Sequence, residues 1–122
     1  MTSDTLGILL ISGEPARVHY AFVLATGAAA IGRDVILFAT DAGCAALLRD
    51  LSGLAAFDAH ATARGVATFS ELRNAASELQ VRMIACEAGL RLFGRDAPLA
   101  DGVEIAGVVT FLEAAQGQVI TL

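Results

Sequence analysis

Short apolar runs of strand length alternate with longer segments of helical pattern along most of the chain. Three of these runs lack the apolar-polar alternation of a half-exposed strand, which indicates strands buried on both faces of a sheet. They are residues 6–11, 35–39 and 81–85. Two further short strands are expected at residues 103–105 and 118–122. The last of them alternates in character, which suits the edge of a sheet.

Helix signals fill the intervals between the expected strands. Pro15 suits a first helical position, and Gly32 suits the position that ends the same helix. Asp41 is a candidate N-cap, and Thr68 with Glu71 forms a capping box. The predicted helices span residues 15–31, 41–51, 68–79, 87–92 and 107–115.

Residues 52–65 are the least regular part of the pattern, and we expect a loop there, with room for a short helical turn. Elsewhere strands and helices interleave on short connections, which favours right-handed crossovers between parallel strands. The chain is therefore expected to form a three-layer α/β/α sandwich with a mainly parallel five-stranded sheet. We expect a single domain over residues 1–122.

Composition and the longest apolar stretch suggest a globular protein of the cytoplasm. The 122 residues are 56% hydrophobic, which is enough for one sizeable core. The longest apolar stretch, residues 20–31, is interrupted by Thr26 and Gly27 and is too short to span a bilayer. The first seven residues hold an acidic side chain and no basic one, unlike a signal peptide. A reducing compartment would keep Cys44 and Cys86 as thiols.

Charge and residue content exclude several classes of function. The net charge of −5 gives no footprint for nucleic acid or an acidic membrane surface. The basic residues are all arginine, so no lysine is present to form a Schiff base or a P-loop. His19 and His60 are not spaced as a metal pair, so no metal is expected. Only Gly13 follows the first strand, which argues against a dinucleotide, although Ser12-Gly13 leaves a flavin mononucleotide open. Our expectation is that the protein has no cofactor.

The strongest candidate for chemistry is Cys86, in the stretch VRMIACEAGLRLFG. It lies where the strand at 81–85 meets the helix that Gly94 closes. The positive end of a helix dipole favours the nucleophilic thiolate at such a junction. Glu87 raises the cost of that charge, and Arg82 or Arg91 would offset it by folding back. The alternative is that Cys86 is a small buried hydrophobic residue that fills the corner.

Other candidates follow the remaining strands at the same edge of the sheet. We expect Ser12, Gly13, Glu87 and Gly107 to line a pocket beside Cys86. Cys44 begins another helix within an apolar run, where packing is the favoured role. It becomes a second thiol of the site only if its loop converges with that of Cys86, because a disulfide needs alpha carbons within about 7 Å.

Three segments carry a resemblance to a known family. They are GILLISGEPARVHYAFVLATGAAAIGRDVILFAT, GVATFSELRNAASELQVRMIACEAGLRLFG and VEIAGVVTFL. Together they resemble the DsrE/DsrF-like family, which includes the TusBCD sulfur-relay subunits. The resemblance implies that Cys86 receives a persulfide sulfur from a donor protein and passes it to an acceptor protein. It also implies homo- or hetero-oligomers, commonly trimers or hexamers. The sequence departs from the nearest members after the cysteine, where it reads Glu87-Ala88-Gly89-Leu90.

The sequence is therefore compatible with two functions. The first is a sulfur carrier of the persulfide sulfurtransferase type, with Cys86 as the reactive residue. The second is a non-catalytic oligomeric α/β module that binds a small ligand or a partner protein at the carboxyl edge of the sheet, with Cys86 only packing.

Overall fold

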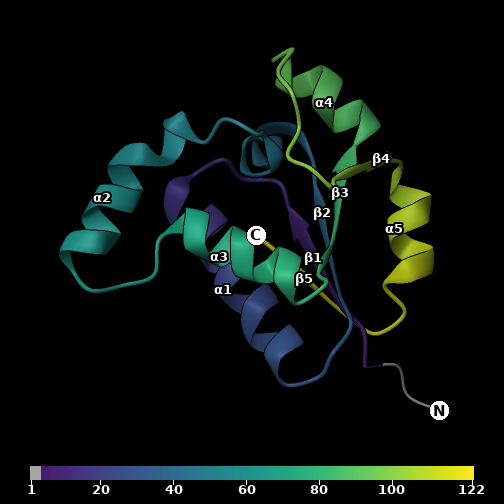
Figure 1. Ribbon diagram of the computed structural model, residues 1–122. Coiled ribbons are helices and arrows are strands. Elements are labelled where there is room, and N and C mark those ends of the chain that lie inside the picture. Colours follow the sequence, from purple (N-terminus) through teal and green to yellow (C-terminus); the bar gives the residue numbers. More distant parts are fainter. Residues whose placement is uncertain (1–3) are drawn as a thin grey trace.

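Five short segments pair into one parallel sheet in the computed structural model, which describes residues 4–122 (Figure 1). The strands are β1 (Leu6–Leu10), β2 (Val35–Ala39), β3 (Arg82–Cys86), β4 (Glu104–Ala106) and β5 (Gln118–Thr121). Their order across the sheet is β4-β3-β2-β1-β5, and every adjacent pair is parallel. The mainly parallel sheet predicted from the sequence is confirmed, and β5 lies at an edge as expected.

Helices cover both faces of the sheet. From β1 to β4 each step along the chain moves one strand in the same direction, so right-handed crossovers place their helices on one face. The step from β4 back to β5 places its helix on the opposite face. Accordingly α1 (Pro15–Ala30) and α3 (Phe69–Glu78) lie on one side, and α5 (Val108–Ala114) lies on the other (Figure 1). The three-layer α/β/α sandwich is thereby confirmed.

The core is divided by the sheet into two unequal clusters. The larger one lies under α1 and α3 and includes Phe22 and Phe69, whose rings meet edge to face at 4.9 Å. The smaller one lies under α5, where the rings of Phe38 and Phe111 stack with centroids 5.0 Å apart. A Cβ on Gly7 would lie 2.7 Å from the Cβ of Ala115, so α5 rests directly on the sheet.

The predicted helix ends are largely confirmed. Pro15 begins α1, and Gly32 follows it with a φ of +91°, a conformation that glycine adopts without strain. Thr68 and Glu71 form the expected capping box at α3. None of the helices within residues 4–122 is long and apolar enough to cross a membrane.

The helix predicted at residues 41–51 is wrong in type and length. The chain there forms a 3₁₀ helix, η1 (Asp41–Leu47), which Thr40 rather than Asp41 precedes as the N-cap residue. Residues 47–49 then pair with residues 98–100 through hydrogen bonds from Arg49 N to Pro98 O and from Ala100 N to Leu47 O. This non-local pairing draws the chain out of the helix after Leu47.

The loop predicted at residues 52–65 is also wrong, because most of it is helical. A short 3₁₀ turn, η2 (Ser52–Leu54), leads into α2 (Ala55–Ala63). Ala61 is the buried residue of α2, so the helix has no apolar stripe for a pattern to detect. Its attachment is polar, since the Asp58 carboxylate accepts hydrogen bonds from Phe69 N at 2.7 Å and from the Ser70 hydroxyl at 2.9 Å.

Candidate functional site

Cys86 occupies the junction between β3 and α4 (Glu87–Phe93). It is both the last residue of the strand and the N-cap of the helix, with extended backbone angles of −66° and 125°. The Gly89 N–H of the first helical turn donates to its Sγ atom at 3.4 Å. The sulfur therefore faces the unpaired N–H groups of the helix, which stabilise negative charge. Gly94 ends the helix with a φ of +72°, as predicted.

The thiol of Cys86 lies between an apolar cluster and solvent. Cys86 pairs in register with Ala106 of the edge strand β4, and both residues pack against the smaller core cluster under α5. Its side chain is partly exposed, unlike that of the buried Ala85 before it. A partly exposed sulfur can meet a second sulfur compound without unfolding of the protein.

Charged side chains next to Cys86 are paired. Glu87 accepts a hydrogen bond from Arg91 at 3.1 Å, which forms an i,i+4 ion pair on the exposed side of α4. Arg91 therefore folds back as anticipated and offsets the carboxylate beside the thiol. Arg82 does not, because it forms a bidentate pair with Glu104 at the other end of β3.

Cys44 lies close to this junction and is completely buried. It is part of η1, and its Sγ atom lies 3.7 Å from the Ala39 carbonyl oxygen. Burial raises the pKa of the Cys44 thiol to about 11, and the negative charges of Cys86 and Asp41 add to that effect. The two loops converge, but the Cys44 sulfur is closed off from solvent. This environment is that of a packing residue.

Helix α4 and η1 are in close contact because position 89 is glycine. A Cβ on Gly89 would lie 2.2 Å from Thr40 Oγ1 and 2.6 Å from Asp41 N. No role was predicted for Gly89 from the sequence. A glycine inside the first turn of a helix was the available signal, since glycine allows close approach of two backbones.

The four residues predicted to line a pocket fall into two groups. Gly107 follows Ala106, the register partner of Cys86, and Glu87 follows Cys86 itself, so these two lie beside the thiol. Ser12 and Gly13 follow β1, and β2 lies between β1 and β3, which separates them from Cys86 by about 10 Å.

The loop after β1 is packed against η1 instead. A Cβ on Gly13 would lie 2.9 Å from the Ala42 carbonyl oxygen, and Ser12 Oγ accepts a hydrogen bond from Glu14 N at 3.0 Å. Gly13 also lines a cavity of about 170 Å³ with Ala45 and Leu48. Within residues 4–122, no group of three or more His, Cys, Asp or Glu side chains is placed to hold a metal ion.

The C-terminal part of the chain matches a known protein family. A profile of the DsrE/DsrF/DrsH-like family matches residues 53–122. The matched segment contains Cys86, Glu87 and Gly107. It begins after Ser12, Gly13 and Cys44.

A curated relative supports the same assignment. The sulfur carrier protein DsrE2 of Allochromatium vinosum is 47% identical over 55 residues. That alignment covers 43% of this chain and 33% of the relative. The matched part thus spans about a third of the length of the relative.

Two solved structures share the fold along nearly the whole chain. The ychN protein from E. coli aligns over all of both chains with a TM-score of 0.69 and 17% identity. The protein MTH1491 from Methanobacterium thermoautotrophicum aligns over 97% of this chain and 98% of its own, with a TM-score of 0.70 and 18% identity. These likenesses establish the fold, and the profile match over more than half of the sequence establishes the family. The chain is a member of the DsrE/DsrF/DrsH-like family.

Proposed function

We propose that this protein is a sulfur carrier that receives sulfane sulfur on Cys86 and passes it to a partner protein. One structural observation carries the proposal: the partly exposed Cys86 sulfur caps α4 and accepts the Gly89 N–H. The similarity to the sulfur carrier protein DsrE2 of Allochromatium vinosum supports the same role in sulfur relay. Together they favour a thiol that takes up sulfur over a thiol that only packs.

The transfer needs no net oxidation or reduction. The Cys86 thiolate attacks the outer sulfur of a donor persulfide, a new S–S bond forms on Cys86, and the S–S bond of the donor breaks. The electron pair of that broken bond leaves on the donor thiolate. An acceptor thiolate then attacks the outer sulfur on Cys86, and the electron pair of the second broken bond returns to Cys86 as a thiolate.

The neighbours of Cys86 have distinct roles in this proposal. Gly89 N–H stabilises the sulfur anion at the start and the end of each transfer. Gly107 leaves open space beside the thiol, because nothing lies within 4 Å of where its Cβ would be. Glu87 flanks the outer sulfur, with its charge balanced by Arg91. Ser12 and Gly13 lie farther along the same edge and would line the part of the pocket that the partner covers.

Protein partners fit the surface next to Cys86. Helix α5 begins one residue after Gly107 and leaves Val108, Val109 and Leu112 exposed, with Leu112 at 56%. Exposed apolar residues grouped on one helix are typical of protein contacts. We propose that this surface contacts sulfur donor or acceptor proteins, or further copies of the chain in a trimer or hexamer. We place the protein in the cytoplasm, where Cys86 stays reduced and available.

Intact-protein mass spectrometry tests the proposal. The protein is reduced, incubated with a low-molecular-weight persulfide, freed of excess reagent and weighed. We expect the wild type and the Cys44→Ser variant to gain the mass of one sulfur atom. Cys86→Ser should gain none. Addition of dithiothreitol should remove the added sulfur, as for any persulfide.

The non-catalytic module remains the second candidate, favoured by the exposed apolar residues of α5. It predicts a different result from the same measurement. An unmodified wild type that still forms a defined oligomer in light scattering would establish the module and overturn the carrier. If Cys86→Ser still gains sulfur, Cys44 and not Cys86 is the residue that receives it.

A further inference from the structure

A cavity of about 330 Å³ lies on the face of the sheet opposite Cys86. Its lining residues are Arg49, Arg73, Asn74, Ser77, Met83, Ala100 and Asp101. Met83 of β3 points to the α3 side, where it belongs to the larger core cluster, whereas Cys86 packs against the smaller cluster under α5. The cavity and the thiol therefore have no wall in common.

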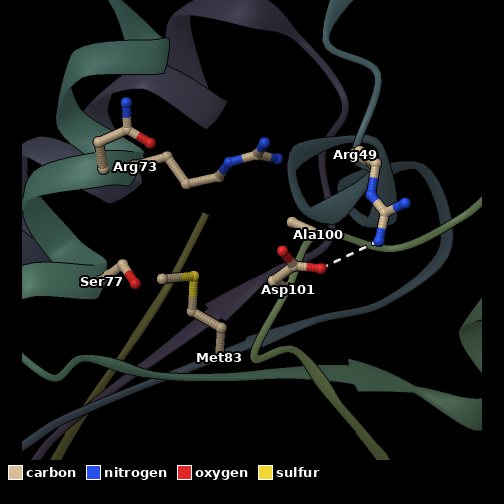
Figure 2. Close-up of a pocket in the computed structure, with 7 residues that line it drawn as sticks. Arg49, Arg73, Ser77, Met83, Ala100 and Asp101 are labelled. Atoms are coloured by element: carbon tan, nitrogen blue, oxygen red, sulfur yellow. Dashed lines mark hydrogen bonds and ion pairs between the residues drawn. The ribbon is translucent and has the colours of Figure 1, made fainter.

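Two separate parts of the chain form the walls of this cavity (Figure 2). Helix α3 supplies three polar side chains on one side: Arg73, Asn74 and Ser77. The opposite wall is the pairing of residues 47–49 with residues 98–100, fixed by two backbone hydrogen bonds of 2.9 Å. Because both walls are hydrogen-bonded elements, the cavity is a built feature of the fold.

Arg73 brings a positive charge into the cavity wall without a carboxylate partner. Its Nη1 atom donates to the carbonyl oxygens of Ala46 and Leu48, and both acceptors are neutral. None of the ion pairs among residues 4–122 includes Arg73. Its guanidinium is half-buried, and burial lowers the pKa of Arg73. A partly desolvated cation gains free energy when an anion comes into contact with it.

The rest of the lining sets the charge and shape of what can enter. Arg49 pairs with Asp101 at 2.9 Å (Figure 2), and both side chains are largely exposed. With that pair neutral, Arg73 leaves the cavity with one net positive charge in a chain of net charge −5. Met83 and Ala100 supply apolar surface beside the polar wall.

We infer that this cavity binds a short-chain carboxylate. The single net charge suits one acid group, and the planar guanidinium of Arg73 suits a carboxylate, with the amide of Asn74 and the hydroxyl of Ser77 as further donors. The hydrocarbon part lies against Met83 and Ala100. The volume is at the small end of ligand cavities, which favours a small anion over a nucleotide.

An NMR titration of the ¹⁵N-labelled protein with butyrate tests this inference, with butanol as the neutral probe of similar length. We expect butyrate to shift the amide signals of residues 73–77, 83 and 100–101 in a saturable manner. Butanol should not shift them. Asn74→Asp adds a carboxylate to the wall and preserves both Arg73 hydrogen bonds. It should raise the butyrate Kd by about tenfold.

The matched control is Gln116→Glu, which makes the same charge change beyond α5, outside the cavity. It should leave the Kd within about twofold, since exposed charges act weakly at a distance. Equal butyrate binding by the wild type and Asn74→Asp overturns the inference, and so does an equal response to butanol. Neither result affects the outcome of the persulfide experiment on Cys86, so the two proposals are tested independently.

Discussion

The two cysteines occupy similar corners of the fold and have opposite environments. Cys86 caps α4 directly after β3, and Cys44 lies within η1, which follows the neighbouring strand β2. The Cys86 sulfur accepts an N–H and stays partly exposed, whereas Cys44 is 0% exposed and its nearest partner is a carbonyl oxygen. Location after a parallel strand is therefore not sufficient for a reactive thiol. The donor that the sulfur meets and the path to solvent make the difference.

This difference in environment also predicts that Cys44 does not take part in sulfur exchange. Exchange with a persulfide requires a thiolate. Because the pKa of Cys44 is about 11, only about one molecule in ten thousand carries that thiolate at neutral pH. In the proposed relay, Cys44 would thus be unable to compete with an external acceptor for sulfur on Cys86, although the two loops lie close together.

The largest expected effect is on the rate of alkylation. In Cys86→Ser, where Cys44 is the remaining thiol, iodoacetamide at pH 8 should modify the folded protein at least about 100-fold more slowly than the unfolded protein, because the pKa is raised from 9.0 to about 11 and the thiol is buried. In Cys44→Ser, Cys86 should react in the folded state. Timed quenching and mass spectrometry give both rates. Equal folded-state rates for the two variants would remove the contrast between the cysteines.

The next effect concerns the contact between α4 and η1, the segment that contains Cys44. Gly89→Ala places a Cβ within 2.6 Å of Asp41 N, so α4 must shift away from η1. We expect the free energy of unfolding to fall by about 2–3 kcal/mol, as for overpacking of a tight contact. Alkylation of Cys44 should accelerate in the same variant. Urea unfolding followed by circular dichroism provides the measurement.

Gly107→Ala is the matched control for that substitution. Gly107 lies at the same edge of the sheet, and nothing lies within 4 Å of its added Cβ. Because Gly107 is the N-cap residue of α5, where glycine is preferred to alanine, the free energy of unfolding should fall by less than about 1 kcal/mol. If both glycine variants unfold alike, the close contact between α4 and η1 does not contribute to the stability of the fold.

The sequence predicted the surroundings of the partly exposed Cys86 better than those of the buried Cys44. The apolar run before Cys86 and the glycine at position 94 are local signals, and they located both β3 and α4 to within a residue. The capping box at Thr68 was equally local. Each of these features depends on residues a few positions apart, so a pattern in the sequence contains them.

The surroundings of Cys44 depend on contacts between distant segments. The η1 segment ends where residues 47–49 pair with residues 98–100, and Arg73 donates to the carbonyl oxygens of Ala46 and Leu48. The order of the strands is likewise non-local, and it places β2 between Ser12 and Cys86. Hydrophobic periodicity contains no information on such pairings. For that reason the 3₁₀ geometry of η1 and the distance between Ser12 and Cys86 appeared only in the structure, whereas the packing role of Cys44 was already favoured by its apolar run.

A smaller effect links Cys44 to the pH dependence of stability. The pKa of Cys44 is about 11 in the folded protein, against 9.0 for the exposed thiol. Between these values the unfolded chain loses a proton that the folded chain retains, so the free energy of unfolding falls as pH rises. We expect a loss of about 1 kcal/mol from pH 8 to pH 10. Urea unfolding should show this loss in the wild type but not in Cys44→Ala, and an equal loss in both would mean that Cys44 ionises freely when folded.

The smallest effect tests the charges beside the open thiol. Glu87 is balanced by Arg91 through an exposed ion pair of 3.1 Å, with 80% of the Arg91 side chain accessible to solvent. Arg91→Gln leaves the carboxylate unbalanced next to a sulfur that must become negative, so alkylation of Cys86 should slow by about twofold to threefold. Glu87→Gln should accelerate it by a similar factor. Because solvent-exposed charges are screened, both changes should shrink when the rates are measured at high salt. If neither substitution changes the alkylation rate of Cys86, the Gly89 N–H, and not the side-chain charges, determines the reactivity of the thiol.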